Sequence, residues 1–169
     1  MTVILTILTC VLYPLAVFAF GQALFRDKAN GSFVAHGSTL IAQAFTSPRF
    51  FHPRPSAAGD GYDGTASSGT NLGPTSQKLR DAVAAAVKAY DVHTNVPADA
   101  VTSSGSGLDP DISPANAYAQ APRVASANHM PLEVVRAAID RNIEGRFLGV
   151  YGEPRVNVLR LNLALAAPR

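Results

Sequence analysis

The sequence predicts an α+β protein in which one membrane-spanning helix precedes a single loop-rich domain. Residues 2–25 carry no charged side chain, and all 14 basic and 12 acidic residues lie at or after Arg26. A helix of this length extends about 36 Å, and a bilayer hydrocarbon core is about 30 Å thick. The rest of the chain combines helical and alternating apolar patterns and is long enough to bury a core. We therefore predict a transmembrane helix over residues 1–26 and one domain over residues 27–169.

A cleaved signal peptide is the main alternative for the apolar segment. It would need a basic leading region, a shorter apolar stretch and a small-x-small cleavage site, and residues 2–25 have none of these. The residues before Cys10 form a poor lipobox, and a globular helix is rarely apolar on every face. Pro14 indicates a kink, with or without a neighbouring helix that compensates for it.

Three segments after the membrane helix show regular periodicity. Residues 75–91 place Leu79, Val83, Val87 and Tyr90 on one helical face. Residues 131–146 do the same with Leu132, Val135, Ile139 and Ile143. Residues 158–165 alternate between leucine and polar residues, which predicts a half-buried strand with Asn162 on its polar face.

The intervening segments are defined by turn and capping residues. Ser113 and Pro114 predict a helix start, and that helix should run to about Ala121, where Pro122 interrupts it. Residues 29–32 read as a turn, and residues 33–45 fit a short strand or helix. Residues 46–74 and 92–110 are predicted loops, and an irregular stretch as long as 46–74 is typical of a functional or binding loop.

Composition and motifs argue against several classes of protein. The net charge of +2 gives no strong field for nucleic acid, and the only cysteine, Cys10, lies in the apolar segment. No Walker loop is present, the four histidines have no metal-binding spacing, and residues 60–64 lack the ligands of a calcium loop.

A set of polar and glycine residues in the loops and at helix ends forms the candidate site. Such residues usually fix loops by capping and turn hydrogen bonds, and the functional alternative is a docking surface for a partner. A second alternative is a membrane-anchored extracytoplasmic serine hydrolase that uses Ser104 or Ser106 with a base such as His93. The candidates are Arg54, Ser56, Asn71, Ser104, Ser106, Gly107, Asp109, Ser113, Gln120, Arg123 and Asn157.

At these loops the chain resembles the KdpC family, the C subunits of bacterial high-affinity potassium-transporting P-type ATPases. The resemblance covers nearly the whole chain, and the region Val101-Thr102 through SGSGLDP to Ile112-Ser113-Pro114 is its most specific part. Family members usually have His where Asp111 stands. The other matching stretches are LYP at 12–14 with ANGS at 29–32, GS at 37–38 through Gln43 and Phe45, FHPRPSA at 51–57 with 68–73, and Gly149 with GEPRVNVL at 152–159 and LNL at 161–163.

The resemblance implies an accessory, non-catalytic subunit of an ATP-driven potassium import complex. Its implied partners are an ATP-hydrolysing P-type subunit, a channel-like potassium-binding subunit and a small single-helix subunit. The family role is to stabilise the assembly and to act as a catalytic chaperone that raises ATP affinity, with SGSGLDP proposed as nucleotide-related; a role at the outer potassium entrance is the alternative. The complex uses ATP and potassium, and we expect neither to be held by this chain.

The resemblance also implies a single-pass protein of the bacterial inner membrane with its C-terminal domain outside the cytoplasm. Counting charges alone points the other way, because Arg26 and Lys28 follow the helix and no basic residue precedes it. Family members usually carry a short basic leader before the helix, so we follow the family topology. An extracytoplasmic domain cannot reach cytoplasmic ATP.

Overall fold

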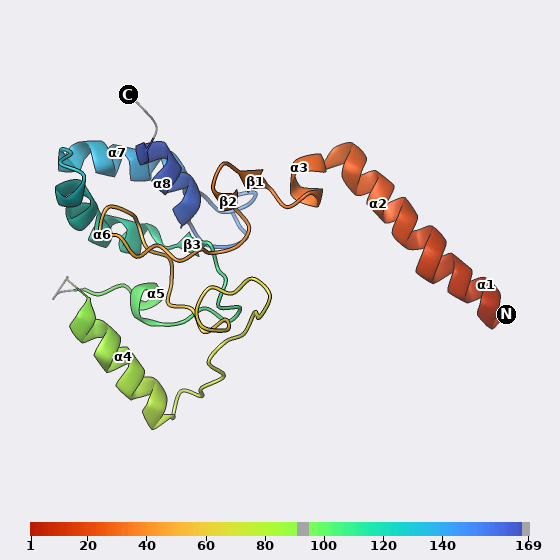
Figure 1. Cartoon of the computed structure of the whole chain (residues 1–169), viewed down its shortest axis with the longest axis horizontal. Coiled ribbons are helices and arrows are strands. Elements are labelled where there is room, and N and C mark those ends of the chain that lie inside the picture. The colour runs from red at the N-terminus through yellow and green to blue at the C-terminus, as the bar shows by residue number, and fades with distance from the viewer. Residues whose placement is uncertain (91–94, 167–169) are drawn as a thin grey trace. The chain divides into compact units, whose positions relative to one another are not determined.

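The computed structural model describes residues 1–90 and 95–166, and it divides into two compact units (Figure 1). The first unit comprises Met1–Leu40 and the second Ile41–Arg169. Each unit is described by itself.

The first unit begins with a continuous helical segment that is long and apolar enough to cross a membrane. It covers Thr2–Leu24, has a mean hydropathy of 2.5, and is not buried against any other part of the described chain. It consists of α1 (Thr2–Ile7), a π-helical segment η1 (Leu8–Leu12) and α2 (Tyr13–Leu24). The π-helical segment ends two residues before Pro14, which supplies no backbone N–H to the helical ladder.

A short polar segment follows this helix. Helix α3 (Arg26–Ala29) leads into the predicted turn, where Gly31 has a φ of 90° and Ser32 a φ of 46°. Strands β1 (Phe33–Val34) and β2 (Gly37–Ser38) then form an antiparallel pair, so the strand option for residues 33–45 is the one observed. The side chains of Gln22 and Asn30 exchange two hydrogen bonds of 3.0 and 3.2 Å, which link the end of α2 to this turn.

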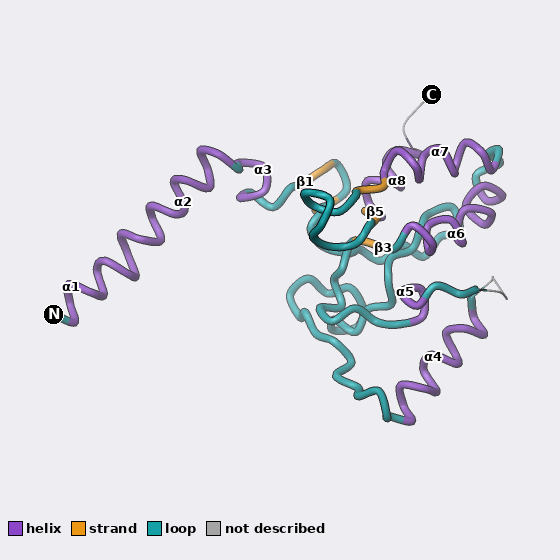
Figure 2. Tube along the Cα trace, turned by 180° about the vertical axis from the view of Figure 1, so that it is seen from behind, coloured by secondary structure: helices purple, strands orange, loops and turns teal. Residues whose placement is uncertain are grey.

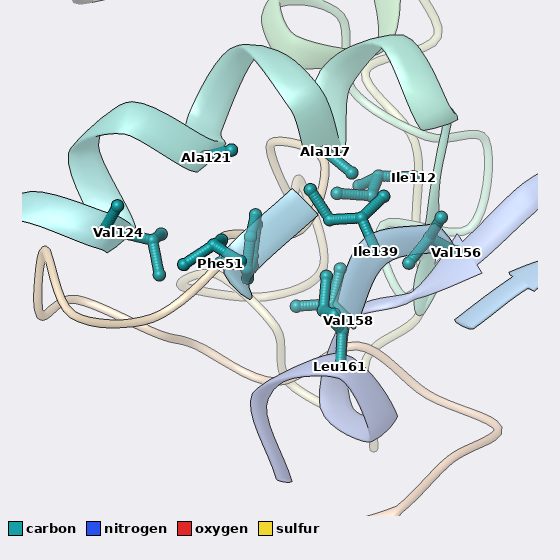
Figure 3. Close-up of a cluster of buried hydrophobic side chains, with 11 residues drawn as sticks. Phe51, Ile112, Ala117, Ala121, Val124, Ile139, Val156, Val158 and Leu161 are labelled. Carbon is teal, nitrogen blue, oxygen red and sulfur yellow. The ribbon is translucent and has the colours of Figure 1, made fainter. Parts of the chain in front are cut away.

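The core of the second unit lies between two packed helices, a small sheet and the C-terminal helix (Figure 3). Helices α6 (Pro114–Ala127) and α7 (Leu132–Asn142) pack against each other, and α8 (Val158–Ala166) packs against α7. The side chain of Phe51 is fully buried among them, although Phe51 belongs to a loop. The buried hydrophobic cluster comprises Phe51, Ile112, Ala117, Ala121, Val124, Ala125, Val135, Ile139, Val156, Val158 and Leu161.

The sheet has the strand order β3-β5-β4, and both pairings are antiparallel. Its strands are β3 (Asp111–Ile112), β4 (Ile143–Glu144) and β5 (Arg155–Asn157). Val156 is the central residue, because it pairs with Ile112 on one side and Ile143 on the other. Strands of two or three residues are too short to show an alternating pattern, so the sequence did not predict them.

The predicted strand at residues 158–165 is wrong, because this segment is helix α8. Val158, Leu161 and Asn162 are buried, and this spacing of three and four residues is that of a helical face. The leucines alternate as in a strand, whereas alternate residues of a helix point to opposite sides, so the alternation did not reveal the buried helical face. Asn162, expected on a polar face, is only 5% exposed.

Two predicted helix ends are also corrected. Helix α6 continues through Pro122 to Ala127, since Val124 and Ala125 beyond the proline are buried in the core and compensate for the lost hydrogen bond. Helix α7 ends at Asn142, before the predicted Arg146, because Ile143 has an extended ψ of 117° and pairs with β5. The predicted buried face of α7 is confirmed by Val135 and Ile139, which have no exposed surface.

Long loops and two further helices complete the unit (Figure 2). Residues 46–74 contain no helix or strand, as predicted. Helix α4 (Gln77–Ala89) is capped by Ser76, and its predicted apolar face is half-buried at best, with Val87 39% exposed. The predicted loop at 92–110 contains a short helix α5 (Ala98–Val101), and residues 91–94 lie outside the described part of the chain.

Candidate functional site

The candidate residues lie in loops that the fold brings together from distant parts of the sequence. Arg54 is central, because its guanidinium reaches the segment 102–109. It forms an ion pair with Asp109 at 3.4 Å and donates to the Thr102 hydroxyl at 3.4 Å and to the Ser103 carbonyl at 3.3 Å. The second oxygen of Asp109 accepts the backbone N–H of Asp111 at 3.1 Å. Arg54 and Asp109 therefore connect the FHPRPSA segment to the SGSGLDP segment.

Ser56 makes a second connection between the same two segments. Its hydroxyl donates to the Gly107 carbonyl at 2.6 Å and accepts the N–H groups of Ala58 at 3.2 Å and Tyr62 at 2.8 Å. Gly107 has a φ of 69°, and a Cβ atom there would lie 2.6 Å from the Ser68 carbonyl oxygen and 2.7 Å from the Ala58 nitrogen. Only glycine fits this position without a shift of the backbone.

The two serines proposed as nucleophiles differ in their surroundings. Ser104 is 3% exposed, and its hydroxyl makes no hydrogen bond within the described residues. The Ser106 hydroxyl accepts the Leu108 N–H at 3.1 Å, which is a turn-forming bond. The proposed base, His93, lies outside the described residues. The hydrolase alternative thus gains no support from the arrangement around either hydroxyl.

Ser113 caps α6 as predicted and also holds the end of the loop in place. Its hydroxyl accepts the Asn116 N–H at 3.1 Å and donates to Asp99 at 2.9 Å. Asp99 further accepts the Ser113 N–H at 2.7 Å and the Asn116 side-chain amide at 3.1 Å. Asp99 on α5 is thereby fixed to the N-terminus of α6, where a carboxylate is favourable.

Two amide side chains hold the loop that enters the core. Gln120 on α6 accepts the His52 N–H at 2.8 Å and donates to the His52 carbonyl at 3.0 Å. Asn162 on α8 does the same for Phe51, at 2.8 and 3.0 Å. Arg123 donates to the carbonyls of Pro48 at 2.6 Å and Phe50 at 3.0 Å. Segment 48–52 therefore has its backbone groups bonded to side chains instead of to a neighbouring strand.

Asn157 and Asp111 join the sheet to α8. The Asn157 amide donates to Asp111 at 3.0 Å, and its oxygen accepts the Arg160 N–H at 3.2 Å in the manner of a helix cap. Burial raises the pKa of Asp111, which outweighs the lowering effects of the Asn157 amide and of Arg155, whose guanidinium lies 3.0 Å from the carboxylate.

Two cavities adjoin these loops. One of about 420 Å³ is lined by residues of the FHPRP loop, Tyr62, Tyr90 and one face of α6 that includes Gln120 and Arg123. The other, of about 330 Å³, is lined by Arg54, Asp99, Asp109, Asp111 and Arg155 among others. Within the described ranges, no three His, Cys, Asp or Glu side chains form a group that could hold a metal ion.

Most of the predicted site residues are thus connected by hydrogen bonds within the domain, with Asn71 as an exception. Asn71 is exposed, has a φ of 53°, and takes part in none of these bonds. Three residues of this network, Asp99, Asn116 and Asn162, were not among the site residues predicted from the sequence. Asn162 was assigned to a strand face, and nothing local in the sequence marks the other two.

Comparison with known proteins gives a consistent result. Residues 1–167 match the family model described as K+-transporting ATPase, c chain. The chain is 52% identical to the potassium-transporting ATPase KdpC subunit of Mycobacterium bovis BCG, with 98% of this chain and 93% of the relative covered. Its identity to the subunit of the same name is 55% in Allorhizobium ampelinum, with coverages of 99% and 92%, and 54% in Myxococcus xanthus, with coverages of 96% and 82%.

The resemblance inferred from the loop motifs is therefore confirmed over nearly the full length of the chain. The N-terminal helix fits the single membrane pass expected of such a subunit. The chain belongs to the KdpC family of potassium-transporting ATPase subunits.

Proposed function

We propose that this chain is the non-catalytic accessory subunit of an ATP-driven potassium importer, with its domain outside the cytoplasm. It holds together an ATP-hydrolysing P-type subunit, a channel-like potassium-binding subunit and a small single-helix subunit. The observation that supports this proposal is that the polar residues of the family motifs form hydrogen bonds within the domain. Arg54, Ser56, Gly107 and Ser113 fix the shape of the SGSGLDP region through bonds within the domain. Such a region presents a rigid surface to a partner protein.

The effect on ATP affinity is indirect in this proposal. A domain on the extracytoplasmic side of the membrane cannot contact cytoplasmic ATP, and the sequence contains no Walker loop. The chain instead favours the conformation of the hydrolysing subunit that binds ATP well, or supports the outer potassium entrance. A ligand or subunit can shift such an equilibrium only by binding the two conformations unequally.

Reconstitution with and without this chain tests the role. The other subunits are purified with the chain, and potassium-dependent ATP hydrolysis is measured over a range of ATP concentrations. We expect the Michaelis constant for ATP to rise and the complex to dissociate more readily when the chain is left out. Hydrolase activity of the isolated chain, or an unchanged complex without it, would contradict the proposal.

A labelling experiment tests the sidedness separately. Cys10 is the only cysteine, so Ala84→Cys in a Cys10→Ala background gives one reactive thiol on the exposed side of α4. A membrane-impermeant maleimide should label it in intact spheroplasts. Labelling only after the cells are broken would place the domain in the cytoplasm.

A further inference from the structure

The hairpin between β4 and β5 ends in an exposed apolar tip, which we define as Phe147, Leu148, Val150 and Tyr151. These side chains are 70%, 77%, 71% and 68% exposed. In the described part of the second unit, the other exposed large hydrophobic side chains are only 38–40% exposed; they are Ile41, Phe50, Val87 and Tyr118. The apolar tip is therefore unlike the rest of the surface of this unit.

The apolar tip has a defined shape. The backbone groups of Phe147 and Tyr151 exchange hydrogen bonds of 2.8 and 2.9 Å, and Gly149 has a φ of 74° at the turn. The side chains of Arg146 and Glu153 form an ion pair at 2.8 Å across the base of the hairpin. Because the hairpin is already ordered, binding through it would cost little conformational entropy.

The size of the apolar tip points to an interface. At roughly 100–150 Å² for each exposed side chain, the four together present about 500 Å², whereas each partner contributes about 800 Å² to a standard protein–protein interface. An apolar patch of this size matches the largest one on a typical monomeric protein, and such patches are often functional.

The charges around the apolar tip favour a protein partner over a lipid surface. Loops that insert into lipid usually offer Lys or Arg side chains to anionic headgroups. Here Arg146 is paired with Glu153, Arg155 with Asp111 and Glu144, and Arg160 also with Glu144. An apolar centre rimmed by arginines that are already paired with carboxylates is the usual composition of a protein interface.

We propose that the apolar tip inserts into an apolar cleft on the extracytoplasmic face of another subunit of the transport complex. This inference rests on the proposed function and identifies the surface through which the domain docks. Aromatic side chains in such a pocket commonly supply most of the binding energy, so Phe147 and Tyr151 are the expected anchors.

Site-specific photocross-linking in the assembled complex tests the inference directly. The photoreactive residue p-benzoyl-phenylalanine replaces Tyr151, and in a matched control it replaces Tyr118, which is 39% exposed on α6. Irradiation of the complex in native membranes should join the Tyr151 probe to a membrane subunit of the transporter. Adducts only with lipid, only with a second copy of this chain, or equally with the Tyr118 probe would overturn the proposal.

A pair of charge substitutions tests the energy of the contact. Leu148→Asp with Val150→Asp should lower co-purification of the transport subunits at least tenfold, while the circular dichroism of the chain stays unchanged because both side chains are exposed. Val87→Asp on α4 is the control. If the wild-type chain itself fails to co-purify, the proposed function fails. If the wild-type and the double variant co-purify equally, only the role of the apolar tip is refuted.

Discussion

The side chain of Asn162 hydrogen-bonds both the N–H and the carbonyl of Phe51, although the two residues are 111 positions apart. The amide thus acts as a one-residue substitute for a neighbouring strand. Phe51 can then bury its ring completely while its backbone remains paired.

Replacing Asn162 with Ala should destabilise the domain severely. The change leaves the N–H and the carbonyl of Phe51 buried without partners, which should lower the free energy of unfolding by about 3 kcal/mol. Chemical denaturation of the full chain in mild detergent measures the loss. Asn71→Asp, at an exposed asparagine outside these bonds whose φ of 53° aspartate also tolerates, is the control, and an equally small effect of both substitutions would refute this role of Asn162.

Gly107→Ala should distort the loop that carries the SGSGLDP motif. A Cβ atom there would meet backbone atoms of Ser68 and Ala58 at 2.6 and 2.7 Å, and the φ of 69° is itself unfavourable for alanine. We expect a loss of at least 1–2 kcal/mol in unfolding free energy, together with weaker assembly. Gly105→Ala is the matched control in the same loop, since its Cβ would meet nothing within 4 Å. Equal stability of the two variants would show that the loop tolerates a side chain at 107.

Ser104 and Ser106 should respond differently to replacement by Ala. Ser106→Ala removes the acceptor of the Leu108 N–H and should cost about 1 kcal/mol, whereas Ser104→Ala removes a buried hydroxyl that bonds to nothing in the described chain and should cost little. Thermal unfolding of each variant, combined with potassium-dependent ATPase assays of the complex, distinguishes them. A hydrolytic activity of the isolated chain that disappeared in either variant would instead revive the serine-nucleophile reading.

The domain should lose stability in mild acid partly through His52. Burial lowers the pKa of His52; the hydrogen bond to the Ser47 carbonyl opposes this shift, and the charge of Arg123 adds to it. The unfolded chain therefore binds a proton at His52 at a higher pH than the folded domain does, so stability falls as the pH drops through about 6.5. Unfolding curves are measured between pH 7.5 and 5 at roughly half-unit intervals. The free energy of unfolding should depend less steeply on pH for His52→Gln than for the wild type. His36→Gln, at an exposed histidine, is the control, and the same change in both variants would contradict the role of His52.

The membrane helix should contribute to assembly as well as to attachment. Pro14 and the preceding π-helical segment interrupt the regular hydrogen-bond ladder, and neighbouring helices usually compensate for such a break. Replacing residues 2–25 with a poly-Leu helix should keep the domain folded but reduce co-purification of the transport subunits. The replacement removes small or hydroxylated residues that are expected to pack against neighbouring helices, namely Thr6, Thr9, Ala16, Ala19 and Gly21. Undiminished yield would mean that the soluble domain alone forms the complex.

Local signals in the sequence predicted the N-terminal helix and helices α4, α6 and α7, but not α8, the sheet or most of the contacts that hold the loops. The absence of charge in residues 2–25 and the periodicity around Val135 and Ile139 are local, and both predictions agree with the structure. The sheet depends on strands of two or three residues, too few to show a period. Segment 158–165 failed for a different reason. Leucine at every second position has the period of a strand, whereas the buried residues Val158, Leu161 and Asn162 follow the helical spacing of three and four.

In the candidate site too, contacts between neighbours in the sequence were predictable and contacts between distant residues were not. Ser113 was recognisable as a helix cap because its partners are its immediate neighbours. The partners of Arg54 and Ser56 are about 50 residues away, so the motif indicated that these side chains matter but not which atoms they bind. The family resemblance identified the loops, and the fold shows that most of the polar groups in them are used to shape the loops themselves.

The hydrogen bonds from α8 to Phe51 make the core of the domain depend on the helix that is synthesised after all its other elements. The backbone of Phe51 is paired with Asn162, and Leu161 belongs to the same buried cluster as Phe51. On the ribosome, the N-terminal helix emerges and can enter the bilayer while the chain that completes the core is still unsynthesised. The core of the domain therefore stays incomplete until α8 has been synthesised. A late nonsense codon or proteolytic trimming within α8 would leave an inserted helix carrying a domain without a core.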